Sequence, residues 1–400
     1  MTTNSPCQGP LTDIRVIELG QIIAGPYCGQ LLADLGADVI KVEDPVNGDP
    51  LRHWGRGGSP VAWSVAARNK RLVTADLRTR DGQALVRKLV AEADMLLENF
   101  RPGTMERWGL DYDSLSADHP GLIMIRVSGY GQTGPYAGRA GYAAVGEAFG
   151  GMRYMCGEPD RPPSRSGLSL GDTMAATFAC NAALAALHHR DRSGEGQVID
   201  ASIYESVLNV LESSIPEYAV DGYVRERSGA TLPSIAPSNL YPCRDGSYLI
   251  AANQDTVFAR LAEAMDQPEL SQDDRFADHE SRGRNMQELD DIIADWTRDK
   301  TVQDVDEIMQ KAGVPAGRIY RVPDMLEDEH YVARDAIVKT PTEEFPDLCM
   351  HNVFPRMSKT QGEIRWTGVT ELGAHNDEVY GDLLGLDAAV LNDLKARGII

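Results

Sequence analysis

The feature that most constrains the fold of this chain is the alternation of short apolar runs with longer helical patterns in its first half. The runs are rich in Val, Ile and Leu, which is typical of buried strands. Helical patterns at 24–37 and 81–93 lie between consecutive runs. Strands that alternate with helices of about ten residues or more form parallel βαβ units, so the first half predicts a doubly wound, Rossmann-like α/β sheet. The runs lie at 13–19, 38–43, 71–77, 95–99 and 122–128.

The middle of the chain predicts a loop region followed by helices. Residues 129–171 are rich in Gly, Pro and Arg and lack a regular period, which favours a long loop with a short helix near 142–149. An Ala-rich helix is expected at 173–189 and another helix at 200–219.

The chain changes character after Tyr223. Closely spaced prolines lead to one strand pattern, and several acidic helical patterns follow it. We interpret 225–322 as a smaller second domain. Past Pro323, strand-like pieces precede two C-terminal helices. The strand is expected at 248–253 and the acidic helices at 255–265, 285–298 and 301–312.

Length and charge exclude several classes of function. A chain of 400 residues exceeds one ordinary core, so two domains or one large domain with an insertion are expected. The formal net charge of −21 argues against nucleic acid and anionic membranes as partners. No run approaches the roughly 18 consecutive apolar residues of a transmembrane helix, so no membrane-spanning helix is expected.

The N-terminus and the cysteines indicate the compartment. Met1 to Pro10 contains no basic segment followed by an apolar run, so no secretory signal is expected. The six cysteines are scattered without a CxxC pair, which favours a reduced, cytoplasmic protein. Neither the cysteines nor the histidines have metal-site spacing, so no metal site is expected.

Basic residues gather in one short stretch of this acidic chain. An anionic ligand would need such a patch, because the global charge repels it. The same stretch is equally compatible with an ordinary solvated charge run. Its members are Arg68, Lys70, Arg71, Arg78 and Arg80, with Arg101 and Arg107 further along.

The glycines after the first apolar run do not form a dinucleotide-binding fingerprint. Gly20, Gly25 and Gly29 lack the G-x-G-x-x-G spacing that lets a pyrophosphate approach a helix start. Glu43 does occupy the place of a ribose-binding carboxylate, but it is one feature among several. A Walker A pattern is absent from the sequence. The sequence therefore argues against a nicotinamide dehydrogenase and a P-loop phosphotransferase.

Several long blocks, in a fixed order, carry a family resemblance. They include AGPYCGQLLADLGADVIKVEDPVNGDPLR at 24–52, LLENFRPGTMERWGL at 96–110, IRVSGYGQTGPYAGRAGYAAVGEAFGGM at 125–152, SGLSLGDTMAA at 166–176 and GEGQVIDASIYESVL at 194–208. In these blocks the chain resembles the class III CoA-transferases, the CaiB/BaiF-type family of formyl-CoA transferase and carnitine-CoA transferase. The similarity runs over nearly the whole chain and is far more specific than any single motif.

The resemblance implies a fold and an activity. The implied fold is a large Rossmann-like domain built from 1–205 and 323–400, a linker at 206–224 and a smaller inserted α+β domain at 225–322. Two such subunits are expected to interlock as a homodimer. The implied activity moves CoA from an acyl-CoA donor to a small free carboxylic acid. CoA is then a substrate, and no permanently bound cofactor is expected.

Asp172 is the nucleophile that the resemblance implies. From the residues alone, two roles stay open for it. Aspartate at the start of the Ala-rich helix is a favoured N-cap, and a carboxylate after Gly167 and Gly171 is also held exposed and aimed for attack. Attack on a thioester gives a mixed anhydride and CoA thiolate, and the thiolate then forms an aspartyl-CoA thioester. The acceptor acid reverses these steps, so neither ATP nor metal is needed.

The resemblance also implies contacts to CoA. Guanidinium groups suit its phosphates. We expect Arg78, Arg101 and Arg107 to lie close together, because the ends of the third and fourth strands are expected to adjoin where ligands bind. The implied contact residues are Gln21, Ile22, Ile23, Ala24, Ala75, Arg78, Asn99, Phe100, Arg101, Arg107 and Arg139.

Three departures from the family's pattern bear on the substrate. Asp44 stands where the pattern has a basic residue, so the adenine or 3′-phosphate contact must differ. Ile23 stands where the pattern has glutamine, and a glycine run of the small domain is missing after 248–253. An apolar Ile23 with Trp54 nearby favours a short-chain or dicarboxylic acyl group over formyl.

Two alternative functions remain to be weighed. An α-methylacyl-CoA racemase-like enzyme would carry Gly-His-Asp where this chain has Gly141-Tyr142-Ala143, so the racemase histidine is missing. A non-catalytic CoA-binding protein would be expected to lack Asp172, which is present.

Overall fold

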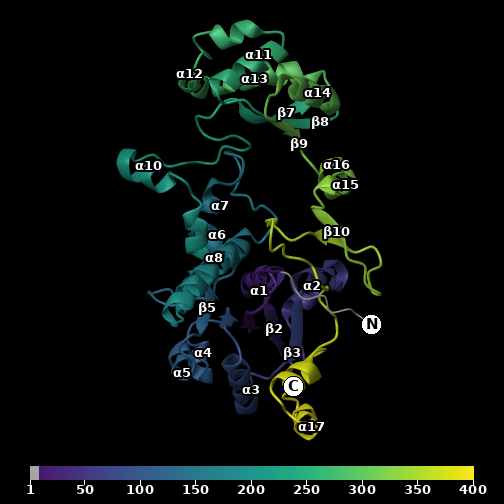
Figure 1. The fold of residues 1–400 in the computed structure, drawn as a ribbon. Coiled ribbons are helices and arrows are strands. Elements are labelled where there is room, and N and C mark those ends of the chain that lie inside the picture. Colours follow the sequence, from purple (N-terminus) through teal and green to yellow (C-terminus); the bar gives the residue numbers. More distant parts are fainter. Residues whose placement is uncertain (1–8) are drawn as a thin grey trace. The chain divides into compact units, whose positions relative to one another are not determined.

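The structure, a computed structural model, describes residues 9–400 (Figure 1). The expectation that Met1–Pro10 holds no secretory signal therefore lies mostly outside the described residues, as does Cys7. The chain forms two compact units. Residues 153–166 and 323–332 belong to the second unit, although the sequence placed them in the large domain. Of the described residues, the first unit holds 9–152, 167–212 and 333–400, and the second holds 153–166 and 213–332.

A six-stranded parallel sheet forms the centre of the first unit (Figure 1). Its strand order, β3-β2-β1-β4-β5-β6, confirms the expected doubly wound, Rossmann-like sheet. β2 pairs with one edge of β1 and β4 with the other, so the order reverses between β1 and β4. Ligands of such sheets bind at this switch point, outside the carboxyl ends of the strands. The strands are β1 (Arg15–Glu18), β2 (Asp38–Glu43), β3 (Lys70–Thr74), β4 (Met95–Glu98), β5 (Ile123–Ser128) and β6 (Val198–Ser202).

Helices and short elements complete the first unit. The helices are α1 (Ala24–Asp34), α2 (Val61–Ala66), α3 (Arg80–Ala91), α4 (Thr104–Trp108), α5 (Tyr112–Ser116), α6 (Ala143–Phe149), α8 (Leu170–Ser193), α9 (Ile203–Asn209) and α17 (Ala388–Ala396). The shorter elements are η1 (Pro50–His53), η2 (Arg56–Gly58), the π-helix η4 (Asp377–Leu383) and an antiparallel pair, β10 (Ile337–Lys339) with β11 (Cys349–His351).

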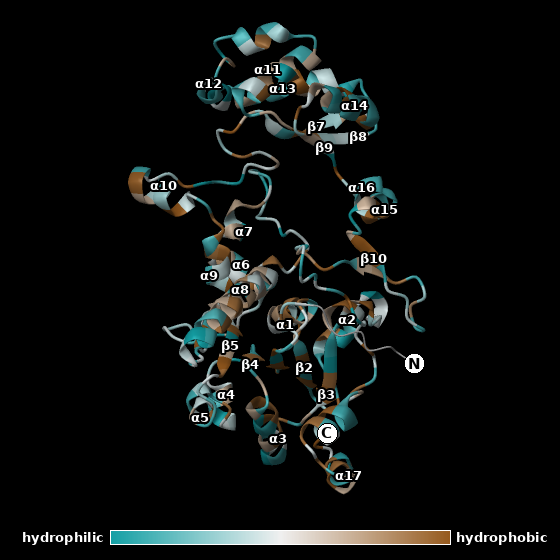
Figure 2. Ribbon diagram, viewed as in Figure 1, coloured by the Kyte–Doolittle hydropathy of each residue, from teal (hydrophilic) through white to brown (hydrophobic). Residues whose placement is uncertain are grey.

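The sheet of the first unit has a hydrophobic core on each face, because neighbouring residues of a strand point to opposite sides. Val16 and Val39 belong to the core that α1 and α8 close. Ile17 and Ile40 belong to the core that α3, η4 and α17 close. Figure 2 shows brown residues beside teal ones along α3 and α17, as expected of helices that bury one face.

Helix α8 is long and apolar enough, by length and composition alone, to cross a membrane. The sequence expectation missed this because Thr177 and Asn181 interrupt the apolar run. Half of the stretch is buried inside the fold. Several of its alanines, among them Ala175, Ala179 and Ala183, belong to the core shared with α1. A core helix meets the same criterion, so the finding is weak support for a membrane span.

The second unit has its own core beneath a three-stranded antiparallel sheet. The core includes Tyr241, Tyr248, Phe258 and Leu289. The strand and the acidic helices expected in this region are confirmed. Its elements are β7 (Ser238–Cys243), β8 (Gly246–Ala251), β9 (Ala316–Arg318), α11 (Asp255–Ala264), η3 (Pro268–Gln272), α12 (His279–Arg284), α13 (Met286–Arg298) and α14 (Val302–Ala312). The short helices α7 (Met152–Met155), α10 (Ser214–Asp221), α15 (Val322–Glu327) and α16 (Glu329–Ala333) lie outside this core.

The single helix expected at 200–219 is wrong. Residues 198–202 form β6 instead, which pairs with β5 as the last strand of the sheet. Ser202 then caps α9 by accepting from Glu205 N–H at 3.2 Å, and Glu212 separates α9 from α10 with a φ of +51°. An edge strand has an exposed side and carries a weaker apolar pattern, so the helical pattern of its neighbours concealed it.

Candidate active site

The loop after β1, residues 20–23, lies at the switch point between β1 and β4. Gln21 N–H donates to Asn99 Oδ1 at 2.7 Å, and Asn99 Nδ2 donates to the Gln21 carbonyl at 2.9 Å. The structure therefore brings Gln21 and Asn99 together at the edge where a ligand is expected. The Asn99 amide also braces the loop, a role that the sequence did not predict.

A buried ionic network lies next to this loop. Lys41 Nζ is 2.9 Å from Asp49 Oδ2 and 3.1 Å from Glu18 Oε1, and Lys70 Nζ is 2.8 Å from Glu18 Oε2. Burial opposes the charged form of Lys41, but the carboxylates of Asp49 and Glu18 outweigh burial and hold the Lys41 pKa above its ordinary value. Burial prevails at Lys70, whose pKa is lowered.

Much of the basic stretch is used inside the fold. Arg68 Nη2 lies 2.6 Å from Asp34 Oδ2, and Arg71 Nη2 lies 2.5 Å from Asp38 Oδ2. Arg68 and Lys70 are 2% and 1% exposed. These three cations are therefore partners of carboxylates of the fold, and the hypothesis of one open phosphate patch is wrong for them.

The ends of β2 and β3 carry a second group of predicted residues. Ala75 is buried, and its N–H donates to the Glu43 carbonyl at 2.9 Å. Arg78 is exposed and donates to Asp44 Oδ2 at 2.8 Å and to Asp76 Oδ1 at 2.7 Å. Asp44, which replaces a basic residue of the family's pattern, thus holds an arginine at the same edge of the sheet.

The residues that follow β4 form a compact turn. Phe100 packs edge-on against Trp108, with ring centroids 5.1 Å apart. Arg107 Nη2 donates to Thr104 Oγ1 at 2.9 Å, and both Arg101 and Arg107 are exposed. Two of the predicted phosphate-binding arginines therefore belong to one short segment.

The expected closeness of Arg78 to Arg101 and Arg107 rested on a wrong strand order. β2 and β1 lie between β3 and β4, so the ends of β3 and β4 do not adjoin. Three strand spacings correspond to about 14 Å. Only an extended ligand that crosses the switch point can reach both groups of arginines.

Glu98 ends β4 beneath that turn and is a buried carboxylate. Its Oε1 accepts from Arg126 Nε at 2.8 Å, and Arg126 also binds Glu106 at 2.7 Å. Burial raises the pKa of Glu98 to about 7, although Arg126 opposes the shift. Glu98 Oε2 accepts from Phe100 N–H at 2.7 Å, so the carboxylate also holds the turn.

Asp172 lies in the first turn of α8 and is 8% exposed. Ser169 is the N-cap, so the N-cap interpretation of Asp172 is wrong, and so is the expectation of an exposed carboxylate. Gly171 N–H donates to Glu147 Oε1 of α6 at 3.4 Å. A Cβ on Gly171 would lie 3.0 Å from Ile203 Cγ2, so the helix start is tightly packed against α9.

An aromatic cluster missed in the sequence gathers after β5 and β6. Tyr130 contacts Phe149 with centroids 5.4 Å apart, and Phe149 contacts Tyr204 at 5.1 Å. Tyr136 joins them, and Arg139 Cζ lies 3.5 Å from the centroid of its ring. Phe149 closes α6, the helix that also supplies the partner of Gly171. The aromatic residues in the 125–152 block were the available signal.

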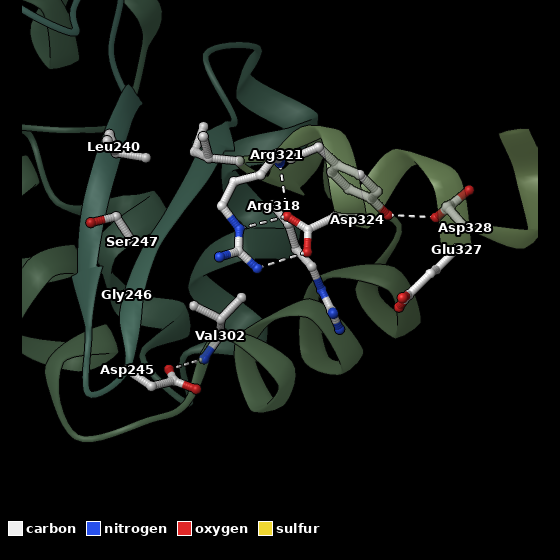
Figure 3. A pocket seen from close by; sticks show the side chains of 12 residues that line it. Leu240, Asp245, Gly246, Ser247, Val302, Arg318, Arg321, Asp324, Glu327 and Asp328 are labelled. Atoms are coloured by element: carbon white, nitrogen blue, oxygen red, sulfur yellow. Dashed lines mark hydrogen bonds and ion pairs between the residues drawn. The ribbon is translucent and has the colours of Figure 1, made fainter. Parts of the chain in front are cut away.

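The cavities divide between the two units. In the first unit, a cavity of about 340 Å³ is lined by Pro45 and Thr74, next to Asp44 and Ala75. A cavity of about 850 Å³ in the second unit contains none of the predicted site residues. Figure 3 shows its Arg321 turned toward Asp324, to which it donates at 3.0 Å. No predicted site residue lines the smaller cavity either, but its Thr74 directly precedes Ala75, a predicted CoA residue.

Within residues 9–400, no group of three or more His, Cys, Asp or Glu side chains is arranged to hold a metal ion.

Comparison with known proteins gives consistent matches over nearly the whole chain. The sequence model of CoA-transferase family III matches residues 11–376. The succinyl-CoA–D-citramalate CoA-transferase of Chloroflexus aurantiacus is 56% identical over 395 residues, which cover 98% of both chains. A succinyl-CoA–L-malate CoA-transferase alpha subunit of the same organism is 41% identical, over 98% of this chain and 93% of its own. A crystal structure of a CaiB/BaiF family protein from Brucella suis matches with a TM-score of 0.83 and 36% identity, over 94% of this chain and 99% of its own.

Proposed function

The chain belongs to CoA-transferase family III and is a CoA-transferase, and from this premise we propose that it moves CoA from succinyl-CoA to a hydroxylated dicarboxylic acid such as D-citramalate. The observation that carries the proposal is the 56% identity to a relative of that activity over 98% of both chains. The relative named for L-malate also uses succinyl-CoA, which supports the donor more strongly than the acceptor.

In the proposed mechanism, Asp172 is the nucleophile. One of its oxygens attacks the thioester carbonyl, the C–S bond breaks, and CoA leaves as thiolate while a mixed anhydride forms. The thiolate attacks the aspartyl carbonyl and releases succinate, which leaves an aspartyl-CoA thioester. The carboxylate of the acceptor then attacks this thioester, its C–S bond breaks, and a second mixed anhydride forms between the acceptor and Asp172. The released thiolate attacks the acceptor's carbonyl, which forms the new acyl-CoA and frees Asp172 as a carboxylate. Each step conserves the thioester's energy.

The position of Asp172 supports this role. The first turn of a helix carries unpaired backbone N–H groups and the positive end of the helix dipole, which stabilise negative charge. Asp172 lies in the first turn of α8, a 24-residue helix. The Asp172 carboxylate is regenerated as an anion after each transfer. The first turn of α8 stabilises that anion and therefore favours turnover.

The proposed path of CoA follows the carboxyl edge of the sheet. CoA is an extended molecule, so it can reach Arg78 after β3 with one end and Arg101 or Arg107 after β4 with another. The 20–23 loop at the switch point lies between these groups. Ala75 and the neighbouring cavity of about 340 Å³ support a place for the adenine.

The proposal extends to assembly and compartment. We infer a large domain built from both chain ends, an interlocked homodimer and a cytoplasmic location. Support comes from the first unit, which combines N-terminal and C-terminal segments, and from the scattered cysteines. Light scattering should give twice the mass of the chain, and a stable, active monomer would contradict the dimer.

A substrate screen tests the function directly. Wild-type protein is incubated with succinyl-CoA, acetyl-CoA or formyl-CoA and a panel of free acids, and the CoA esters are measured by mass spectrometry. We expect succinyl-CoA with citramalate or malate to give the most product. Formation of formyl or oxalyl esters at a higher rate would overturn the substrate assignment, and no transfer with any donor would overturn the function.

A further inference from the structure

Ile22 has a backbone conformation that β-branched residues rarely adopt. Its φ is +67°, in the left-handed region, where the side chain crowds the following carbonyl. A residue persists there only when its surroundings fix it, and such residues gather at ligand sites. Ile22 lies in the 20–23 loop, at the switch point of the sheet.

Three side chains bind the backbone of this loop. Ile22 N–H donates to both carboxylate oxygens of Asp49, at 3.1 and 3.2 Å. Lys41 Nζ donates to the Gly20 carbonyl at 2.6 Å. Asn99 binds both the N–H and the carbonyl of Gln21, which lies between Gly20 and Ile22. Consecutive polar groups of the loop are thus bound by side chains from three separate segments, which determines the loop's shape.

Asp49 and Lys41 are buried clamps. Each is 1% exposed, and their charged atoms are 2.9 Å apart. Asp49 Oδ1 also accepts from Leu51 N–H at 2.8 Å. Burial opposes the ionised form of Asp49, but Lys41 and the backbone N–H groups outweigh it and hold the Asp49 pKa below its usual value. The carboxylate is therefore charged and fixed at neutral pH.

We propose that Asp49, fixed by Lys41, is a positioning residue that holds the 20–23 loop in its CoA-binding shape before acyl-CoA arrives. The inference rests on the proposed function, in which this loop lies along CoA. Asp49 acts through the backbone of Ile22 and need not touch the substrate. A preformed loop lowers the ordering cost of binding, so the kinetic parameters for acyl-CoA should respond more than those for the acceptor acid.

Variants of Ile22 test the loop and leave the buried pair intact. Ile22→Pro removes the N–H and fixes φ near about −65°, whereas Ile22→Ala keeps the N–H. We expect Ile22→Pro to lower kcat/KM for acyl-CoA on the order of 100-fold, the loss that a misplacement of about 1 Å causes. Ile22→Ala should lose less. An Ile22→Pro enzyme within about threefold of wild type would overturn the proposal.

A rescue experiment tests Asp49 itself. Asp49→Asn should lower kcat/KM for acyl-CoA because it weakens the clamp. Glycine adopts positive φ without steric cost, so adding Ile22→Gly should recover about tenfold of that loss. A double variant no better than Asp49→Asn would mean that Asp49 serves folding alone and would overturn the positioning role. If Asp49→Asn does not fold, the Ile22→Pro comparison decides.

Asp34→Asn is the matched control. It removes another buried carboxylate, bound by Arg68 away from the loop. It should lower thermal stability and leave the KM for acyl-CoA unchanged. An equal rise of that KM would assign the Asp49 effect to general destabilisation and overturn the proposal.

Failure of this inference differs from failure of the proposed function. A wild-type protein that transfers CoA from no donor contradicts the function. Wild-type transfer with an unimpaired Ile22→Pro variant contradicts the positioning role alone. Calorimetric titration with CoA itself adds a readout that needs no turnover, and Ile22→Pro should weaken that binding.

Discussion

The loop at the switch point and the start of α8 are held in place by different physics. Charged and amide side chains, of which Asp49 is one, bind the backbone of the 20–23 loop. Close packing holds the start of α8. A Cβ on Gly171 would lie 3.0 Å from Ile203, and one on Gly146 would lie 2.4 Å from the same side chain.

The difference separates binding from chemistry. Hydrogen bonds to charged side chains orient the backbone groups of the loop. Packing sets how closely α8 approaches its neighbours and is sensitive to side-chain volume. Variants that change a charge or a backbone bond near the loop should therefore alter the handling of acyl-CoA. Variants that change volume near α8 should alter turnover.

Removing Asp172, the proposed nucleophile, should have the largest effect and should alter turnover without altering CoA binding. We expect Asp172→Ala to lower kcat on the order of 10⁴-fold or more, the scale seen when a covalent nucleophile is lost. CoA binding, measured by calorimetry, should stay close to wild type because the loop is held independently. Asp172→Asn, of nearly equal volume, is the control for packing. Near-normal transfer by Asp172→Ala would refute the mechanism.

The pH dependence of the unfolding free energy should show the effect of ionising Glu98, the buried carboxylate that supports the turn after β4. Its raised pKa means that the folded state binds the proton more tightly than the unfolded chain, whose glutamate titrates near 4.5. The stability that Glu98 contributes below about pH 4.5 is therefore lost as pH rises through about 7, by up to ~3 kcal/mol. Glu98→Gln should remove this decline. Urea unfolding at about pH 5 and about pH 8 measures it, and equal pH dependence in both proteins would contradict the burial of an ionisable Glu98.

Adding a single methyl group at Gly171 should test whether packing at the start of α8 controls turnover. Gly171→Ala places a Cβ 3.0 Å from Ile203 and 3.2 Å from the Ala143 carbonyl, so the first turn of α8 must shift. We expect kcat to fall on the order of 100-fold while the KM for acyl-CoA changes little. The paired variant Gly171→Ala with Ile203→Leu, which removes the Cγ2 methyl that the new Cβ would meet and keeps the side-chain volume, should recover part of the loss. A larger change in KM than in kcat would contradict the separation.

Removing Arg107, a proposed phosphate contact, should have the smallest effect and should alter the binding of acyl-CoA. Arg107→Ala should raise the KM for acyl-CoA about tenfold by loss of a charge-assisted hydrogen bond. The KM for the free acid should stay unchanged, and the difference should shrink as salt screens the wild-type contact. Arg80→Ala, which removes an exposed arginine of the same basic stretch, is the control. A rise confined to the acceptor's KM would place Arg107 at the carboxylate site instead.

Sequence patterns predicted the parts of the fold that depend on local periodicity. Buried parallel strands are apolar on both faces, so 38–43 was recognised with the bounds of β2. Residues 198–202 have an exposed side and the pattern of an edge strand, and the helix expected at 200–219 wrongly included 200–202. Strand order is not a local property, and the expected meeting of Arg78 with Arg101 failed for that reason.

Partners distant in sequence could not be predicted for the candidate site. Arg68 and Lys70 lie in a stretch of basic residues, and no local feature of the sequence shows that they form buried ion pairs with Asp34 and Glu18. The positive φ of Ile22 could not be predicted from the sequence either, because isoleucine disfavours it and the Asp49 carboxylate that accepts from Ile22 N–H lies 27 positions away. Asp172 was identified by family resemblance, but its burial depends on how α8 packs against α6 and α9.

Trapping the covalent intermediate tests the central claim most directly. The protein is incubated with succinyl-CoA in the absence of acceptor and quenched with hydroxylamine, and its peptides are analysed by mass spectrometry. The proposed mechanism predicts an aspartyl hydroxamate on the peptide that contains Asp172, and none in the Asp172→Ala variant. Transfer that proceeds with no modification of Asp172, or with the adduct on another residue, would contradict it.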